Sequence, residues 1–148
     1  MSSLKDFYKN KKVFITGHTG FKGTWLTACL LKFGSKIMGY SKPDSKLKTY
    51  KSMCHHNKVK NVYADILDYS YFRNKIINFK PQIIFHLAAQ SLVSESYKFP
   101  LETVATNIMG TTNILNISRE VKSLNSLVIV TSDKCYLNRE LTRGYRES

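Results

Sequence analysis

A glycine-rich turn between an apolar run and a helical pattern constrains this chain more than any other feature. Val13–Thr16 is followed by glycines at positions 17, 20 and 23 and then by apolar residues at helical spacing. In this order a strand enters a tight turn and a helix begins, whose N–H groups and dipole favour an anion. We expect Gly17 to make the turn, Gly20 to allow a close phosphate approach and Gly23 to pack the helix against the strand. The pattern predicts a dinucleotide diphosphate here; an ordinary glycine-rich βα turn is the alternative.

Strands and helices alternate along the rest of the chain. Strands are expected at Lys12–Thr16, Lys36–Tyr40, Val59–Ala64, Gln82–Leu87 and Leu127–Thr131. One helix is expected at Phe21–Phe33, with Gly34 as the terminating glycine. A second helix is expected to begin after Asp68, which would cap it, and a third to run over Pro100–Val121. Ser41–Asn57 is expected to be a loop with a helical turn or two. The apolar positions of the first helix are Phe21, Trp25, Leu26, Cys29, Leu30 and Phe33. The alternation predicts one α/β domain over residues 1–148, a Rossmann-type doubly wound parallel sheet in the strand order 3-2-1-4-5.

Composition excludes several classes of function. No apolar run approaches about 18 residues and the N-terminus has no signal-peptide core, so we expect neither membrane insertion nor export. The three cysteines lack framework spacing and suit the reducing cytoplasm. Cys54, His55 and His56 have no second ligand pair at zinc spacing, so no metal site is predicted. The net charge of +13 is concentrated in residues 1–60 and favours a solvated surface that attracts anionic nucleotides over nucleic-acid binding.

Small and polar residues follow each predicted strand, at the edge where parallel sheets bind ligands. Ala88 and Ala89 would let a flat cofactor lie against the backbone, and Asp65 would either bind an adenine amino group or cap a loop. The acid expected about 20 residues past the glycines is missing, and Ser41 with Lys42 stands there, so both NAD and NADP stay open. The predicted cofactor contacts are Gly17, His18, Gly20, Phe21, Lys22, Gly23, Ser41, Asp65, Ile66, Leu87, Ala88, Ala89 and Gln90.

Four segments resemble the extended short-chain dehydrogenase/reductase superfamily of NAD-dependent epimerases and dehydratases: residues 17–26, 86–90, 106–111 and 131–136. The first and last, GHTGFKGTWL and TSDKCY, are similar to the CDP-glucose 4,6-dehydratase branch. The resemblance implies a cytoplasmic, homo-oligomeric lyase with NAD as cofactor and CDP-glucose or a related nucleotide sugar as substrate. Its product would be CDP-4-keto-6-deoxyglucose, for deoxysugars of lipopolysaccharide O-antigens.

The resemblance also implies roles for single residues. The sugar would be oxidised at C4, lose water across C5 and C6, and be reduced at C6, with NAD as the transient hydride carrier. Ser132 would bind the developing oxyanion at O4, and Asp133 would protonate the departing C6 hydroxyl. Lys134 replaces the glutamate of dTDP-glucose dehydratases, and would either take the C5 proton or contact a phosphate. Asn107 would position the cofactor loop.

The Tyr-x-x-x-Lys pair, which supplies the catalytic base of this superfamily, is not found where it belongs, after the loop of the fifth strand. The spacing occurs at Tyr8–Lys12 and Tyr71–Lys75, and neither is in that place. We therefore expect an N-terminal, cofactor-binding part of a longer enzyme, inactive alone and without the sixth strand and the substrate domain. The alternatives are another nucleotide-sugar epimerase or dehydratase of the superfamily, and a non-catalytic NAD(P)-binding module.

Overall fold

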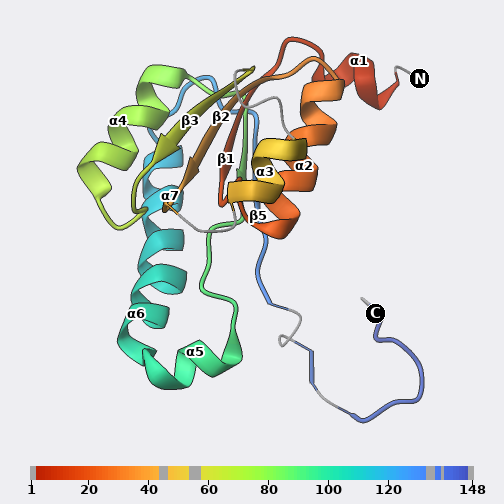
Figure 1. The fold of residues 1–148 in the computed structure, drawn as a ribbon, viewed down its shortest axis with the longest axis vertical. Helices are drawn as coiled ribbons and strands as arrows, with labels where there is room; N and C mark the ends of the chain where they lie inside the picture. The colour runs from red at the N-terminus through yellow and green to blue at the C-terminus, as the bar shows by residue number, and fades with distance from the viewer. Residues whose placement is uncertain (1–2, 44–46, 54–57, 133–135, 138, 147–148) are drawn as a thin grey trace.

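The computed structural model describes residues 3–43, 47–53, 58–132, 136–137 and 139–146. Parallel strands form one sheet in the order β3-β2-β1-β4-β5, which confirms the predicted topology (Figure 1). The strands are β1 (Lys12–Thr16), β2 (Lys36–Ser41), β3 (Val59–Tyr63), β4 (Ile83–His86) and β5 (Ser126–Ile129). Each lies within its predicted range or extends one residue beyond it.

Helices connect the strands. They are α1 (Leu4–Tyr8), α2 (Phe21–Lys32), α3 (Leu47–Met53), α4 (Tyr69–Phe79), α5 (Val93–Lys98), α6 (Pro100–Val104), the π turn η2 (Ala105–Met109) and α7 (Gly110–Ser118). Asp68 caps α4 as expected, because its side chain accepts the N–H of Tyr71. The sequence predicts neither α1 nor α5. The single helix predicted from Pro100 is interrupted by η2 and ends at Ser118.

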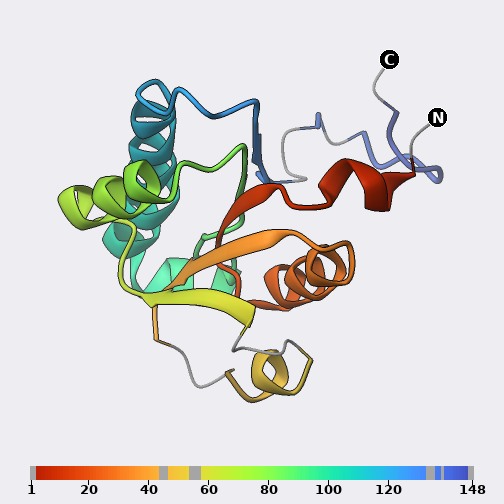
Figure 2. The same ribbon diagram turned by 90° about the horizontal axis from the view of Figure 1, so that it is seen from above.

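Helices cover both faces of the sheet, with α2 on one side and α4 and α7 on the other (Figure 2). The side chains of β1 alternate between the two faces: Phe14 packs toward α4 and α7, whereas Val13 and Ile15 pack toward α2. The larger cluster contains Phe14, Tyr40, Ile66, Phe72, Ile76, Phe79, Ile84, Ile114, Ile117 and Val121. The smaller one contains Val13, Ile15, Leu30, Ile37, Val59 and Ile83. Burying each such side chain contributes about 1.5–3 kcal/mol, so these clusters hold the helices against the two faces of the sheet.

The buried face of α2 differs from its apolar pattern. Phe21 and Trp25 are 80% and 54% exposed, and Cys29 is exposed as well. The helix instead faces the sheet with Gly23, Thr24, Thr27 and Leu30. An ideal Cβ on Gly23 would lie only 2.1 Å from the carbonyl oxygen of Gly17. Because α2 lies this close to the turn, small residues must occupy its inner face near the N-terminus, and the larger ones point outward.

Within the described ranges, no helix combines the length and the apolar character needed to cross a membrane. Among the same residues, no three His, Cys, Asp or Glu side chains are placed to hold a metal ion. The sequence Cys54-His55-His56 lies outside the described residues.

Candidate functional site

A cavity of about 700 Å³ opens at the carboxyl ends of the strands, where the connections of β1 and β4 leave the sheet in opposite directions. Most of the predicted cofactor contacts line it: Gly17, Gly20, Phe21, Lys22, Gly23, Ser41, Asp65, Ile66, Leu87, Ala88 and Ala89. Thr19, Lys42, Pro43, Ala64, Ser91, Thr106, Val130 and Thr131 complete the lining. The structure thus brings together segments that are far apart in the sequence.

The glycines that separate β1 from α2 have three different conformational roles. Gly17 has φ +69° and makes the turn, as predicted, and its ideal Cβ would lie 2.9 Å from the backbone of Leu87 and Ala88. Gly20 is the N-cap of α2 and leaves the cavity side of the turn without a side chain. Gly23 packs α2 against the turn itself rather than against the strand. Side chains at Gly17 or Gly23 would collide with backbone atoms, so the turn requires glycine at both positions.

The N-terminus of α2 faces the same cavity. The N–H groups of Phe21, Lys22 and Gly23 lie in the first turn of the helix, where no intrahelical acceptor exists, and all three residues line the cavity. Gly20 provides no capping oxygen, and the first turn holds no acidic residue. The positive end of the helix dipole therefore faces a cavity without a protein anion in this turn. This cradle fits the diphosphate of a dinucleotide.

A buried hydrogen-bond relay fixes the backbone after β4. Thr16 Oγ1 accepts the N–H groups of Leu87 and Ala88, both at 3.1 Å, so its own proton is donated to His86 Nδ1 at 2.8 Å. His86 therefore carries its proton on Nε2, which lies 3.4 Å from Thr111 Oγ1. Burial lowers the pKa of His86 to about 4, so the ring is neutral at neutral pH. The relay holds the flat backbone stretch against which the predicted cofactor would lie.

The π turn η2 brings Asn107 to the segment after β4. Asn107 Oδ1 accepts the backbone N–H of Gln90 at 2.8 Å, and its Nδ2 donates to the carbonyl oxygen of the same residue at 2.9 Å. Gly110 follows the π turn and packs directly on Ile66, which lines the cavity. Neither Asn107 nor Gln90 lines this cavity itself. Asn107 thus holds the loop by both backbone groups of Gln90. That this loop contacts a cofactor stays a prediction.

Replacing Thr16 by Val is expected to destabilise the chain by about 2 kcal/mol, because His86 Nδ1 and the N–H group of Ala88 lose their partner in the interior. The N–H group of Leu87 keeps the carbonyl oxygen of residue 16 as its acceptor at 3.2 Å. Thr27→Val is the matched control, since Thr27 Oγ1 is buried and has no hydrogen-bond partner among the described residues. We expect this control to be as stable as the wild type or more stable. Urea unfolding followed by circular dichroism measures both. Equal destabilisation by the two substitutions would show that the Thr16 relay contributes nothing specific.

His18 lies behind the cavity rather than in its lining. Its ring is fully buried, with Nδ1 2.8 Å from Ser41 Oγ and Nε2 3.1 Å from Asn61 Oδ1. Burial lowers the pKa of His18 to about 4, although the hydrogen bond with Asn61 opposes this shift. The side chain of His18 therefore holds Ser41 in place through a hydrogen bond. Only the backbone of His18 is left for the predicted contact with a cofactor, and that contact stays a prediction.

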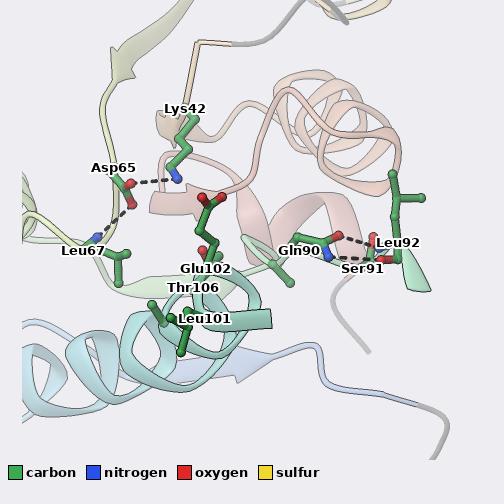
Figure 3. A pocket seen from close by; sticks show the side chains of 11 residues that line it. Lys42, Asp65, Leu67, Gln90, Ser91, Leu92, Leu101, Glu102 and Thr106 are labelled. Atoms are coloured by element: carbon green, nitrogen blue, oxygen red, sulfur yellow. Dashed lines mark hydrogen bonds and ion pairs between the residues drawn. The ribbon is translucent and has the colours of Figure 1, made fainter. Parts of the chain in front are cut away.

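An adjoining cavity of about 660 Å³ shares Lys42 and Asp65 with the first (Figure 3). Lys42 Nζ lies 2.8 Å from Asp65 Oδ2, and Asp65 Oδ1 accepts the N–H of Leu67 at 3.0 Å. Figure 3 shows Glu102 pointing toward this ion pair, and Gln90 lines the same cavity. Asp65 thus has the loop-capping role left open by its sequence position. Its role toward an adenine stays a prediction.

The residues that follow β5 lie at one end of the cavity lining. Val130 and Thr131 line the main cavity, and the exposed Ser132 follows them. Asp133 and Lys134 lie outside the described residues. The catalytic roles of Ser132, Asp133 and Lys134 therefore stay predictions.

Sequence reasoning missed Thr16 and His86 as parts of the site. Both are polar residues at the last position of neighbouring buried strands, and they face each other in the register of β1 with β4. A polar residue that ends an apolar strand is a signal that could have found them, because a buried polar group needs a partner. Thr111 offers no such signal, since its approach to His86 depends on the packing of α7.

Comparison with known proteins places this geometry in a family. A family model described as GDP-mannose 4,6 dehydratase matches residues 14–142. The CDP-glucose 4,6-dehydratase of Salmonella typhimurium is 43% identical over 145 residues, which cover 97% of this chain and 40% of that protein. This chain thus spans less than half of the length of that relative.

Two solved structures share the fold. The epimerase Mth375 of Methanothermobacter thermautotrophicus superposes with a TM-score of 0.85 at 23% identity, over 97% of this chain and 41% of its own. The UDP-glucose-4-epimerase of Stenotrophomonas maltophila, solved with NAD and a formylated UDP-arabinopyranose, gives 0.77 at 23% identity, over 90% of this chain and 40% of its own. The family match over most of the chain, on a Rossmann sheet with a glycine cradle at its carboxyl edge, shows that this chain belongs to the GDP-mannose 4,6 dehydratase family.

Proposed function

We propose that this chain is the NAD-binding part of a nucleotide-sugar 4,6-dehydratase that converts CDP-glucose to CDP-4-keto-6-deoxyglucose. The observation that supports it most is the cavity lined by Gly17–Gly23 and Leu87–Ala89, in a chain 43% identical to the Salmonella CDP-glucose 4,6-dehydratase. The family includes enzymes for other nucleotide sugars, and an epimerase or dehydratase for one of those is the alternative.

The proposed cofactor is NAD, which supplies reversible hydride transfer to and from the sugar. The first-turn N–H groups of α2 would bind its diphosphate, and Gly17 and Gly20 would let the phosphates approach the backbone. Ala88 and Ala89 would lie along the dinucleotide, on backbone that Thr16 and Asn107 hold in place. The dinucleotide would extend from the β2 side of the cavity toward Thr131 at the other end of its lining.

The proposed chemistry at the sugar follows the residues after β5. Ser132 would donate a hydrogen bond to the oxygen at C4 as negative charge develops there. Asp133 would donate a proton to the departing hydroxyl of C6, which requires a carboxyl with a raised pKa. Lys134 would take the C5 proton or bind a phosphate.

The complete enzyme is proposed to be a cytoplasmic homo-oligomer that supplies deoxysugars for lipopolysaccharide O-antigens. Exposed apolar side chains along α6, η2 and α7 support a contact between subunits: Leu101, Val104, Ile108 and Leu115, which are 83%, 52%, 58% and 47% exposed. The cellular role and compartment rest on the resemblance to CDP-glucose 4,6-dehydratases.

A chimera tests the proposed function. Residues 1–148 would replace the matching segment of the Salmonella dehydratase, and the 4-keto sugar formed from CDP-glucose and NAD would be followed by its ultraviolet absorbance in base. We expect turnover of CDP-glucose, and a loss of about 100-fold or more in kcat for Asp133→Asn, because the proton donor is removed. Arg139→Gln, at an exposed position in the same segment, is the control and should retain activity. A folded chimera that binds NAD but forms no 4-keto sugar from CDP-glucose would contradict the proposed function.

A further inference from the structure

We infer that Ser41 accepts a hydrogen bond from the 2′-hydroxyl of the adenosine ribose while His18 holds the proton of Ser41 away from the cavity, so that the chain selects NAD over NADP. The inference rests on the proposed function, because it concerns the cofactor cavity. The inference goes beyond the proposed function by assigning the choice between the two dinucleotides to a buried hydrogen-bond relay.

The direction of this relay is set at Asn61. Its Nδ2 donates to the carbonyl oxygen of Val59 at 3.2 Å, which fixes the amide and turns Oδ1 toward His18. Oδ1 also accepts the hydroxyl of Tyr50 at 2.7 Å. Because Oδ1 can only accept, His18 Nε2 must donate to it across 3.1 Å. A neutral His18 then has no proton on Nδ1, so Ser41 Oγ donates its proton to Nδ1 at 2.8 Å.

The surroundings of His18 keep the ring in this state. Tyr50 stacks edge-on with its ring centroid 5.0 Å from that of His18, and Tyr63 lies at 6.1 Å on a tilted plane. An ideal Cβ on Gly39 would come within 2.3 Å of the His18 ring, so the ring fills the space that a side chain there would need. Burial disfavours the imidazolium more than the hydrogen bonds with Asn61 and with the backbone of Tyr40 favour it, so the pKa of His18 is lowered and the ring stays neutral.

Ser41 stands where the adenosine ribose is expected. It is the last residue of β2 and lines the cavity beside the glycine turn. In this fold an acid about 20 residues past the glycines accepts a hydrogen bond from the ribose 2′-hydroxyl. Ser41 Oγ also accepts the backbone N–H of Thr19 at 3.4 Å. With its proton committed to His18, Ser41 has one lone pair left for the cavity and so replaces that acid as an acceptor. A 2′-phosphate also presents only acceptors, so it would meet Ser41 without a hydrogen bond.

Lys42 is the residue that could reverse this preference. It lies next to Ser41 and is paired with Asp65 at 2.8 Å, and both side chains of the pair line the cavity. A 2′-phosphate that drew Lys42 away would leave the Asp65 carboxylate facing the same anion. Exposed ion pairs are weak, so a 2′-phosphate could compete with Asp65 for Lys42. Tighter binding of NADP than of NAD to the wild type would therefore show that Lys42, and not Ser41, controls the choice.

Isothermal titration of the 148-residue chain with NAD and with NADP tests the inference. We expect NAD to bind about tenfold more tightly, which corresponds to one to two hydrogen bonds. Ser41→Ala should weaken NAD binding roughly 3–10-fold and leave NADP binding nearly unchanged. Asn61→Asp should reverse the direction of the Ser41 hydroxyl. The new carboxylate favours a protonated His18, whose Nδ1–H then donates to Ser41 Oγ. The Ser41 proton consequently turns into the cavity, where it strengthens NADP binding.

Ser52→Ala is the control, because it removes an exposed serine hydroxyl of α3 that donates to the carbonyl oxygen of Thr49 rather than to His18, Asn61 or Ser41. Its ratio of NAD to NADP affinity should equal that of the wild type. Equal affinities or tighter NADP binding in the wild type, or an unchanged ratio in Ser41→Ala, would overturn the inference and leave the proposed function standing. A folded chain that binds neither dinucleotide would overturn both. If Asn61→Asp does not fold, Ser41→Ala decides.

Discussion

Gly23→Ala is expected to destabilise the chain by about 3 kcal/mol and to lower its melting temperature by roughly 10 °C. The ideal Cβ at this position would lie 2.1 Å from the carbonyl oxygen of Gly17 and 2.8 Å from His18 Cα, both of them backbone atoms that no side-chain rotation can move away. The substitution therefore forces α2 away from the turn. We also expect NAD binding to fall by about 100-fold or more, because the first-turn N–H groups move with the helix.

Two other glycines are matched controls for Gly23→Ala. Gly144 has no atom within 4 Å of an ideal Cβ, and Gly144→Ala should leave both stability and NAD affinity unchanged. The nearest atom to an ideal Cβ on Gly20 is the Gly17 oxygen at 3.3 Å, so Gly20→Ala should fold and lose cofactor affinity without a large loss of stability. Thermal unfolding and titration with NAD measure these effects. A Gly23→Ala variant with wild-type stability and affinity would contradict the close packing of α2 on the turn.

Lowering the pH from about 6.5 to about 4 is expected to remove roughly 3 kcal/mol of stability for each of His18 and His86. Burial lowers both pKa values from 6.5 to about 4, and the rings are 0% and 2% exposed. Within this interval the two histidines bind protons in the unfolded chain but not in the native one, so the free energy of unfolding decreases as the pH falls. The combined loss is comparable to the whole stability of a typical domain, about 5–15 kcal/mol, and we expect acid unfolding near pH 5 to 4.

Urea unfolding at about pH 7 and at about pH 5 measures this dependence. His86→Gln is the informative variant, because it removes one of the two buried rings and should reduce the pH dependence by about half of their joint contribution. Comparing it with the wild type cancels the contributions of all other titratable groups. Carboxylates with lowered pKa values, such as Asp6 and Glu120, act at lower pH and do not produce the same slope. Equal pH dependence in the two proteins would contradict a neutral, buried His86.

The strands and the glycine turn could be predicted from the sequence because their signals are local. Val13–Ile15 and Ile83–Phe85 are continuous apolar runs, which suit strands buried on both faces. Gly17 sits where its neighbours demand a left-handed turn, and its φ of +69° agrees with that expectation. The same local reasoning placed most of the cavity lining, since the carboxyl ends of parallel strands share one edge of the sheet.

The rest depends on packing between distant segments. The apolar periodicity of α2 indicated a helix but not its inner face, which the approach of Gly23 to Gly17 decides. The π turn η2 has no signature in residues 105–109 that single-sequence patterns resolve. His18 looked like a cofactor contact from its place in the glycine motif. Its burial depends on Asn61 in β3, which no spacing rule connects to it.

The most direct measurement is a titration of the ¹⁵N-labelled chain with NAD, followed residue by residue in amide spectra. We expect the largest shifts at the backbone amides of Gly20–Gly23 and of Ala88–Ala89, because the diphosphate is proposed to bind the N-terminus of α2 and the dinucleotide to lie along the backbone after β4. Saturable shifts confined to other surfaces, such as the lysine-bearing amino ends of the strands, would contradict a cofactor cradle between β1 and α2.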